Sequence, residues 1–417
     1  MLFLYNLAVL IASFVLKLIA NFSPKLKLFV DGRKNVFPQL QKEITDQDQV
    51  IWVHTASLGE FEQGLPIIEK LKIAYPHFKI LVTFFSPSGY EVKKNSTVAD
   101  LVLYLPLDTK KNTVKFMALA RPKLAIFVKY EIWPNYLQEL KKQQIPTLLI
   151  SAIFTKRQVF FKGYGGFMRK GLRTFSHIFV QDQNSKDLLK SIDINHTTIA
   201  GDTRLDRVSE ILGRDNALGF MATFKQGKLC LVAGSTWPED EAILLDYINK
   251  GDQDMKYAIA PHNIKEAHIQ KLKGAISKNT VLYSELEHSD ISNAQVLIID
   301  TVGLLTKIYS YADIAYVGGG FATGLHNTLE PAVFGIPVLI GPQFSGFKEA
   351  EDLVALKGVL PVADKTDLQS TLDNLVQNVG YRKETGTINS TYITQNKGAS
   401  LKILQHLETV LSSLNSK

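Results

Sequence analysis

The sequence predicts an α/β protein with two parallel sheets, each covered by helices on both faces. Short apolar runs alternate with longer segments of helical periodicity, which is the pattern of buried strands and crossover helices in a parallel sheet. The alternation pauses between about residues 205 and 225 and then resumes, so the chain divides into two similar halves. At 417 residues the chain is also too long for one ordinary core.

Eleven apolar runs are predicted as strands. They are, in chain order, 50–54, 79–84, 101–105, 124–128, 147–150, 177–180, 228–233, 256–260, 296–300, 314–317 and 336–340. Phe61 to Leu71 has the apolar spacing of a helix, and Leu401 to Leu414 predicts an amphipathic closing helix. The predicted domains are 35–210 and 211–417. Two doubly wound halves imply a cleft between them, with ligands at the carboxyl ends of the strands.

Composition limits the class of protein and its partners. Apolar residues make up 46% and charged residues 21%, as in globular proteins. The single cysteine, Cys230, excludes a disulfide framework and is predicted to lie in a buried strand. A net charge of +7 favours acidic partners. We find no nucleic-acid-binding module, so anionic lipid and phosphorylated substrates are the preferred partners.

Residues 1–22 are predicted as a membrane-associated helix. Met1 to Leu16 carries no charge, and the apolar run reaches Phe22, close to the roughly 20 residues that span a bilayer. A basic region typical of a cleaved signal peptide does not precede it. Its polar residues fall on one helical face: Asn6, Ser13, Lys17 and Asn21. A basic cluster follows, comprising Lys25, Lys27, Arg33 and Lys34. That cluster suits anionic headgroups and predicts a cytoplasmic position for the downstream chain, whereas the alternative is a core helix followed by a solvated loop.

A glycine-rich segment, Gly318 to Pro331, predicts a nucleotide-sugar site. Three glycines follow the predicted strand 314–317, and Asn327 to Pro331 opens a helix-like run. Glycines let the backbone approach a ligand, and free N–H groups at a helix start attract phosphate. Glu330 would repel a phosphate, so it is expected to bind ribose hydroxyls instead.

Three charged residues in the first half are candidates for chemistry. Glu60 follows the strand 50–54 and is predicted either as a general base or as a first-turn residue that complements the helix dipole. Glu131 follows another strand and either steadies positive charge on a sugar ring or caps a helix. Arg204 either holds a phosphate through its guanidinium fork or forms a surface ion pair with Asp206.

The second half repeats strand, turn and helix start. Ser235 and Thr236 are predicted to cap a helix and donate to a phosphate. His262 is a candidate contact to a base or phosphate, or a loop histidine without a role. No metal-spaced cluster, nucleophile elbow or Gly-Lys-Ser/Thr phosphate loop is found, so metal and covalent mechanisms are not predicted.

These blocks, in this order and over nearly the whole chain, resemble the 3-deoxy-D-manno-octulosonate (Kdo) transferases of lipopolysaccharide assembly. They are the apolar N-terminus, H-T-A-S-L-G-E, E-I-W-P-N, G-D-T-R-L-D, A-G-S-T-W-P-E-D-E, A-P-H, D-T-V-G-L-L and H-N-T-L-E-P. The resemblance implies a GT-B fold, two Rossmann-like domains with an inter-domain cleft. It also implies inverting transfer of Kdo from CMP-Kdo to a tetraacylated lipid A precursor (lipid IVA). The reaction would take place at the cytoplasmic face of the inner membrane, without a cofactor or metal.

The resemblance also implies roles for individual residues. Glu60 matches the catalytic base, and Glu131 and Arg204 match positions that stabilise the transition state. The CMP-binding segments match Pro261, His262, Gly303, Leu304, Leu305, Asn327, Thr328, Leu329 and Glu330. The chain departs from the pattern at Arg204, where many relatives have lysine. It departs again at Leu304, where many have an acidic residue, so only a backbone contact is expected there.

Two other functions compete with this one. Another GT-B enzyme, a glycosyltransferase or epimerase acting on a different nucleotide sugar, is the first alternative. A nicotinamide-dependent oxidoreductase is the second, but it requires G-x-G-x-x-G after the first strand, which His54 to Glu60 does not supply. The number of Kdo residues transferred stays open.

Overall fold

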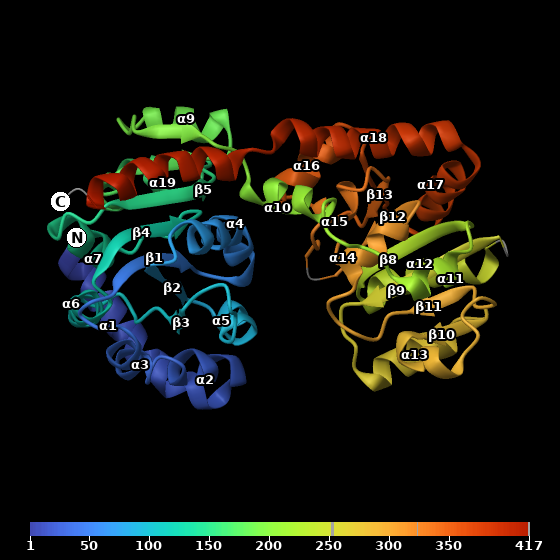
Figure 1. Ribbon diagram of the computed structural model, residues 1–417, viewed down its shortest axis with the longest axis horizontal. Coiled ribbons are helices and arrows are strands. Elements are labelled where there is room, and N and C mark those ends of the chain that lie inside the picture. Colours follow the sequence, from blue (N-terminus) through green and yellow to red (C-terminus); the bar gives the residue numbers. More distant parts are fainter. Residues whose placement is uncertain (252–253, 323, 416–417) are drawn as a thin grey trace. The chain divides into compact units, whose positions relative to one another are not determined.

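The computed structural model describes residues 1–251, 254–322 and 324–415, and these form two compact units. One unit comprises Met1–Asp206 together with the segment that starts at Lys397, and the other comprises Arg207–Asn396. Each unit contains a seven-stranded sheet in which all paired strands are parallel, with helices packed against it (Figure 1). The predicted α/β class is therefore confirmed. The cleft expected between the halves stays a prediction.

The first sheet has the strand order β3-β2-β1-β4-β5-β6-β7. Its strands are β1 Gln49–Thr55, β2 Phe78–Phe84, β3 Leu101–Tyr104, β4 Pro122–Val128, β5 Thr147–Ala152, β6 His177–Val180 and β7 Thr197–Ile199. The chain adds β2 and β3 on one side of β1 and then returns to add β4 on the other. The strand order therefore reverses between β1 and β4, which is where such sheets bind ligands.

Helices and short 3₁₀ turns connect these strands. They are α1 Leu2–Ile19, η1 Ala20–Phe22, α2 Pro24–Asp31, α3 Val36–Glu43, α4 Leu58–Ala74, α5 Pro87–Lys93, α6 Lys110–Ala120, α7 Pro134–Lys142, η2 Val159–Phe161, η3 Gly163–Gly165, α8 Gly166–Leu172, α9 Gln183–Lys190 and α10 Thr203–Ile211. The helix predicted at 61–71 is α4, which extends three residues further at each end and contains Pro66.

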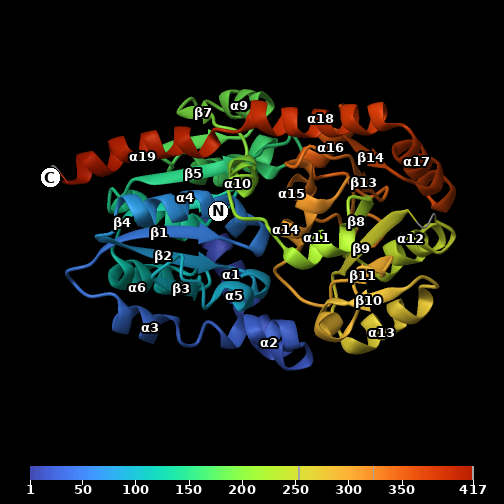
Figure 2. The same cartoon turned by 45° about the vertical axis from the view of Figure 1, so that its right-hand side comes forward.

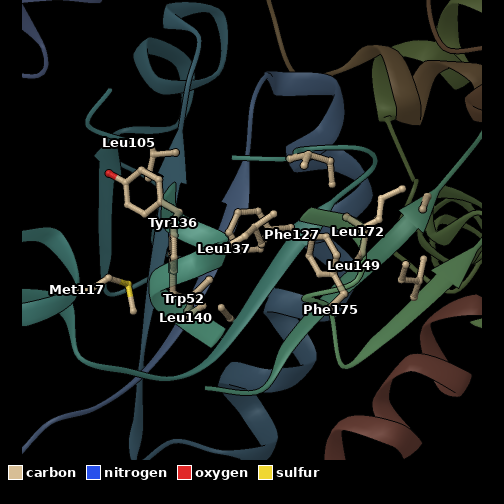
Figure 3. Close-up of a cluster of buried hydrophobic side chains, with 14 of the residues drawn as sticks. Trp52, Leu105, Met117, Phe127, Tyr136, Leu137, Leu140, Leu149, Leu172 and Phe175 are labelled. Atoms are coloured by element: carbon tan, nitrogen blue, oxygen red, sulfur yellow. The ribbon is translucent and has the colours of Figure 1, made fainter. Parts of the chain in front are cut away.

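The core of the first unit lies on both faces of its sheet. Strand residues such as Trp52 and Phe127 point into one cluster with Tyr136, Leu137 and Leu140 of α7 (Figure 3). Side chains of opposite parity, among them Ile51 and Val53, enter a second cluster with α4. Period-two burial of apolar residues on two faces explains why these strands read as continuous apolar runs.

The C-terminal helix α19, Ala399–Asn415, belongs to the first unit rather than the second. Its apolar face, including Ile403, Leu407 and Leu411, is buried in the same cluster as Ile68 of α4. Figures 1 and 2 show this helix, drawn in red, lying along the first unit's sheet. The expected second domain, 211–417, therefore differs from the unit Arg207–Asn396. The helix itself was predicted, but the partner of its apolar face was not.

The second sheet has the strand order β10-β11-β9-β8-β12-β13-β14. Its elements are α11 Gly219–Lys225, β8 Leu229–Thr236, α12 Pro238–Lys250, β9 Met255–Pro261, α13 Glu266–Ala275, β10 Thr280–Leu282, η4 Tyr283–His288, β11 Val296–Ile298, α14 Leu305–Ile308, η5 Tyr309–Tyr311, β12 Ile314–Val317, α15 Leu329–Ala332, β13 Val338–Ile340, α16 Lys348–Ala355, β14 Val359–Pro361, α17 Lys365–Gln377 and α18 Val379–Asn396. Cys230 is buried in β8, as predicted. The order reverses between β8 and β12, so this sheet also has a switch point.

The N-terminal helix docks on the first unit through a few polar contacts. The Tyr5 hydroxyl donates to Asp108 Oδ2 at 2.7 Å, and the side-chain amide of Asn135 donates to Asn6 Oδ1 at 2.8 Å. The stretch Leu2–Phe22 has a mean hydropathy of 2.2, and none of its most apolar window is buried. Within the described ranges this is the one helix long and apolar enough to cross a membrane.

Candidate active site

The switch point of the first sheet brings together two carboxylates predicted from the sequence. Strands β1 and β4 are hydrogen-bonded neighbours. The chain leaves β1 at Thr55, turns, and begins α4 at Leu58, so that Glu60 lies in the first helical turn. Glu131 lies in the loop between β4 and α7. Both side chains therefore stand at the carboxyl edge of the sheet, where a ligand of this fold class binds.

The Glu60 carboxyl group is held in a buried position that favours its neutral form. The residue is 7% exposed, and its Oε2 accepts the backbone N–H of Ala56. Burial raises the pKa of Glu60 to about 7, and the neighbouring Glu131 charge adds to the rise. The Ala56 N–H and the Lys129 charge oppose it but do not cancel it. A carboxyl group with a pKa near the working pH is suited to accept a proton.

Glu131 is oriented by an aromatic side chain and an imidazole. The indole Nε1–H of Trp133 lies 3.0 Å from Glu131 Oε2 and also 3.0 Å from Nε2 of His54. His54 Nε2 is 3.4 Å from the same carboxylate oxygen. Trp133 therefore packs against the core and also holds the Glu131 carboxylate.

His54 was not singled out as a site residue, yet it is fully buried at this edge. Its Nδ1 lies 2.9 Å from the Thr83 hydroxyl, which in turn accepts the indole N–H of Trp52 at 2.8 Å. The Thr83 carbonyl oxygen, 3.2 Å from Nδ1, can only accept, which favours a proton on Nδ1 and leaves Nε2 to accept the Trp133 indole N–H. The sequence did contain a signal for His54, because a histidine ends an otherwise apolar predicted strand. Its partners Thr83 and Trp133, however, come from segments that are distant in the sequence.

The segment before Glu131 places a cation and a phenol beside the two carboxylates. Lys129 has a φ of +67°, an uncommon left-handed conformation for a residue other than glycine. Burial raises the pKa of Tyr130, and the charges of Glu60 and Glu131 add to this rise. Lys129 and Tyr130 are thus within electrostatic reach of Glu60, and the sequence prediction had not assigned them a role.

Arg204, at the start of α10, is paired with Asp202 rather than with Asp206. Its Nη2 lies 2.6 Å from Asp202 Oδ2 and its Nε lies 3.0 Å from the same oxygen. Asp206 instead accepts the backbone N–H groups of Gly398 and Ser400, which begin the return of the chain into α19. The observed partner is therefore Asp202, whereas the alternative considered from the sequence was an ion pair with Asp206; the expected phosphate contact of Arg204 stays a prediction.

The switch point of the second sheet forms a glycine loop around a buried carboxylate. The predicted Gly318–Pro331 segment follows β12 as expected, with Thr323 outside the described residues. Asp240 Oδ2 accepts the N–H of Gly319 at 2.9 Å, and Oδ1 accepts the Tyr316 hydroxyl at 2.8 Å. A Cβ on Gly318 would come within 2.3 Å of the Ser235 carbonyl oxygen, so only glycine fits there. Asp240 was missed because it reads as an ordinary first-turn acid.

Three rings lie together at the same edge. The Trp237 and His262 rings are stacked, with centroids 4.5 Å apart and an interplanar angle of 21°. His326 lies 4.7 Å from His262, and its Nε2 accepts the Trp237 indole N–H at 3.1 Å. His262 is exposed, and its predicted contact with a base or phosphate stays a prediction. Trp237 and His326 were not predicted to join it.

The Asn327–Glu330 segment is pre-ordered, but not every residue in it is accessible. Glu330 accepts the Thr306 hydroxyl at 3.0 Å and the Asn327 side-chain amide at 3.2 Å. Thr328 is 1% exposed and its hydroxyl has no partner. Leu329 has no exposed surface in this structure, and its contact with CMP stays a prediction.

The remaining residues predicted to bind CMP or its phosphate also differ in how accessible they are. Pro261 is buried at the end of β9, whereas Gly303, with a φ of +92°, is exposed in the loop before α14. Leu304 and Leu305, at the start of α14, are partly exposed. Ser235 and Thr236 do not cap α12, because Trp237 occupies the N-cap position. Thr236 is buried and bonds Glu241 at 3.0 Å, which leaves Ser235 as the more accessible hydroxyl.

No group of three or more metal-binding side chains occurs among the residues that the structure describes. The arrangement in the first unit is suited to proton transfer near a developing positive charge. The arrangement in the second unit offers backbone N–H groups, a hydroxyl and stacked rings, which are the groups that hold a nucleotide.

Comparisons with known proteins agree with this description. A family model described as 3-deoxy-D-manno-octulosonic-acid transferase (kdotransferase) matches residues 31–207. A 3-deoxy-D-manno-octulosonic acid transferase of Haemophilus influenzae is 30% identical over 384 residues, which cover 87% of this chain and 87% of that protein. One from Aquifex aeolicus is 29% identical over 351 residues, covering 82% and 90% respectively.

A solved structure supports the fold class alone. The UDP-GlcNAc 2-epimerase of Neisseria meningitidis matches with a TM-score of 0.60 at 17% identity, covering 87% of this chain and all of that one. Together with the two parallel seven-stranded sheets, this likeness confirms the predicted GT-B class.

Proposed function

The chain belongs to the 3-deoxy-D-manno-octulosonic acid (Kdo) transferase family, and from this premise we propose its donor, acceptor and mechanism. As a member it is a glycosyltransferase of lipopolysaccharide biosynthesis. The proposed donor is CMP-Kdo and the proposed acceptor is a tetraacylated lipid A precursor (lipid IVA). The observation that carries the proposal is the buried Glu60, with a pKa of about 7, beside Glu131 at a sheet switch point.

Glu60 acts as the general base in this proposal. It removes the proton from the attacking acceptor hydroxyl while that oxygen forms a bond to the anomeric carbon of Kdo. The bond from that carbon to the CMP phosphate oxygen breaks, and CMP leaves with the electron pair. A single displacement of this kind inverts the anomeric centre. CMP is already a good leaving group, so one protein base is sufficient.

Glu131 stabilises the transition state by its charge. As the bond to CMP breaks, the sugar ring develops oxocarbenium character, and a fixed carboxylate nearby lowers the energy of that positive charge. Trp133 holds the carboxylate in position through its indole N–H at 3.0 Å. Arg204, already aligned by Asp202, is proposed to stabilise the charge that develops on the departing phosphate.

The second unit is proposed to bind the CMP part of the donor. The Ser235 hydroxyl, near the carboxyl end of β8, suits a phosphate. The N–H groups of Gly318 and Gly319 are already bonded to Gly234 and Asp240, so they fix the glycine loop beside it. Glu330, ordered by Thr306 and Asn327, keeps lone pairs for ribose hydroxyls. The stacked Trp237 and His262 rings offer a surface for the base.

The proposed place of reaction is the cytoplasmic face of the inner membrane. The apolar α1, with its exposed side chains, is suited to the bilayer, and the basic cluster that follows it is suited to anionic headgroups. Both features would bring the enzyme to an acceptor that carries acyl chains and phosphates.

Transfer to a purified tetraacyl lipid A precursor, with CMP-Kdo generated in situ and products resolved by mass, tests the proposal. A product heavier by one or more Kdo units supports it and counts the residues added. Donor competition tests the nucleotide: CMP should inhibit and UDP should not. Inhibition by UDP alone, without a Kdo-bearing product, would contradict the proposal and favour an enzyme of another nucleotide sugar.

A further inference from the structure

A pocket of about 620 Å³ lies in the first unit, where α1 meets α2 and the loop that follows β3. Its volume is within the range of about 300–1,000 Å³ typical of small-molecule sites. Part of the wall comes from Ser13, Lys17 and Asn21, three of the four polar residues that share one face of α1. The polar face of this apolar helix is thus turned toward a hollow in the protein rather than toward a packed surface.

The pocket carries more positive charge than its own carboxylate can neutralise. Four lining residues are cationic and one, Asp31, is anionic. Asp31 is already paired with Lys34 at 2.6 Å. In the part of the chain that the structure describes, no carboxylate lies within ion-pair distance of Lys17, Lys27 or Arg33. An anion in the pocket would therefore meet three cations without displacing an existing partner.

Arg33 is fixed in place before any ligand arrives. Its Nε donates to the Leu105 carbonyl at 2.9 Å, Nη1 to Phe29 at 2.6 Å and Nη2 to Phe85 at 2.7 Å. The guanidinium also lies 3.7 Å above the Phe29 ring. These contacts use three of the five N–H donors of arginine, so two remain for a ligand. A rigid guanidinium fork is suited to the oxygen atoms of a phosphate.

The position of the pocket beside the exposed apolar helix α1 indicates which kind of ligand it binds. On the flank of α1 next to the pocket-lining Lys17 and Asn21, Leu10, Phe14 and Leu18 are 56%, 64% and 57% exposed. A lipid beside α1 can therefore lay its acyl chains along these side chains while its headgroup enters the pocket. We propose that this pocket binds the phosphodiester headgroup of an anionic glycerophospholipid of the surrounding bilayer. The inference rests on the membrane association proposed above, and it adds a specific lipid site to it.

The site is connected to the catalytic side chains by packing. Phe85, whose carbonyl accepts from Arg33, packs against Trp133 with ring centroids 4.6 Å apart and an interplanar angle of 38°. Trp133 in turn bonds Glu131. The pocket is therefore connected through Arg33, Phe85 and Trp133 to the side chain that stabilises the transition state in the proposed mechanism.

Binding of short-chain lipids to the full-length protein in neutral detergent tests the site. Dihexanoyl phosphatidylglycerol should bind saturably at one site, and dihexanoyl phosphatidylcholine should bind much more weakly. Because the acyl chains of the two lipids are identical, the difference in Kd reports recognition of the headgroup. Lys17→Gln combined with Lys27→Gln should raise the Kd for the phosphatidylglycerol by about fivefold for each charge removed. Arg33 is kept, because its three carbonyl contacts support the fold.

The matched control is Lys25→Gln combined with Lys42→Gln, which removes the same charge outside the pocket. Lys25 lies on the same helix as Lys27 but does not line the pocket. An equal loss of binding in the control would overturn the proposal in favour of a general basic surface. Equal binding of the two lipids by wild type would also overturn it.

Two further readouts separate the site from the rest of the proposed function. Both variants and wild type should float equally with phosphatidylcholine vesicles, because α1 is intact. If wild type does not float, membrane association fails and the lipid site with it, although transfer in detergent would still support the enzyme function. A higher KM of the Lys17→Gln, Lys27→Gln variant for lipid acceptor in phospholipid-free detergent would overturn the proposal, since the acceptor itself would then occupy the pocket.

Discussion

The indole nitrogen of Trp133 lies 3.0 Å from Oε2 of Glu131, and the same N–H is within 3.0 Å of His54 Nε2. One donor therefore faces both an imidazole and a carboxylate that come from different strands. Because His54 is itself held by Thr83 and Trp52, the carboxylate is fixed by a chain of buried side chains. Such pre-ordering is what electrostatic stabilisation of a transition state requires.

Glu60→Gln should reduce the transfer rate by about 10²–10⁴-fold, the usual contribution of a general base. Binding of CMP, measured by calorimetry, should change little, since Glu60 belongs to the first unit and the CMP segments to the second. The control is Glu62→Gln on the same helix, which removes a charge paired with Lys93. Wild-type turnover in the Glu60 variant would show that another group is the base.

The transfer rate should rise with pH and level off above about 7, because Glu60 works as a base only when ionised and its pKa is raised to about 7. Glu131 contributes to that rise, so Glu131→Gln should move the midpoint of the pH–rate profile to lower pH. Rates measured with saturating donor and acceptor from pH 5 to 9 check this. A midpoint that does not move would exclude electrostatic coupling between the two carboxylates.

The buried Glu60 should also affect stability with a definite sign. Its pKa is about 7 in the folded protein and about 4.5 when unfolded, so the folded state binds the proton more tightly. This contribution is present below pH 4.5 and is lost as the pH rises to 7. Glu60→Gln should therefore stabilise the protein by up to roughly 3 kcal/mol at pH 8 and much less at pH 5. Thermal unfolding at the two pH values measures the difference.

Trp133→Phe should lower kcat by about tenfold, as expected for the loss of one hydrogen bond to a charged group. The phenyl ring keeps the packing on Phe85, so KM should stay close to the wild-type value. Kinetics with the donor and acceptor varied separately test this. A rise in KM with kcat unchanged would mean that Trp133 binds substrate instead of orienting Glu131.

Asp240→Ala should raise the Kd for CMP by about 10–100-fold, because three groups lose a buried charged acceptor. The glycine loop would then lack the contact that fixes Gly319. Asp246→Ala, on the same helix and paired with Lys250 at the surface, is the matched control and should bind CMP normally. Calorimetric titration of both variants with CMP provides the comparison.

Leu407→Ala should destabilise the first unit by about 2–5 kcal/mol, since this side chain is fully buried against that unit's core. Leu401→Ala, on the same helix but 61% exposed, should change stability by less than about 0.5 kcal/mol. Limited proteolysis should cut the first unit of the Leu407 variant before the second. If protease cut both units of the Leu407 variant at the same rate, the assignment of α19 to the first unit would be contradicted.

Local sequence patterns were sufficient for most strands but not for all of them. Strands β7, β10 and β14 were not predicted, and each has only three residues. Strands β11 and β13 are equally short, but they lie within the longer predicted runs 296–300 and 336–340. A run of three residues is long enough to extend a sheet at its edge, yet too short to show a period. The two strands that carry the site, β1 and β12, were predicted because both are buried on two faces and read as continuous apolar runs.

The sequence by itself determined the α/β class, the two repeating halves, the apolar N-terminal helix and the carboxyl-edge positions of Glu60, Glu131 and Gly318. These follow from periodicity and from residues that are adjacent in the chain. The tertiary structure alone decided that α19 joins the first unit, that Arg204 pairs with Asp202, and that Leu329 is buried. It also decided the partners of His54, Asp240 and Arg33. The Arg204–Asp202 pair is local, but Asp206 was an equally near partner in the sequence. The contacts of His54, Asp240 and α19 join segments from different strands and loops, and no local pattern encodes which of these will meet.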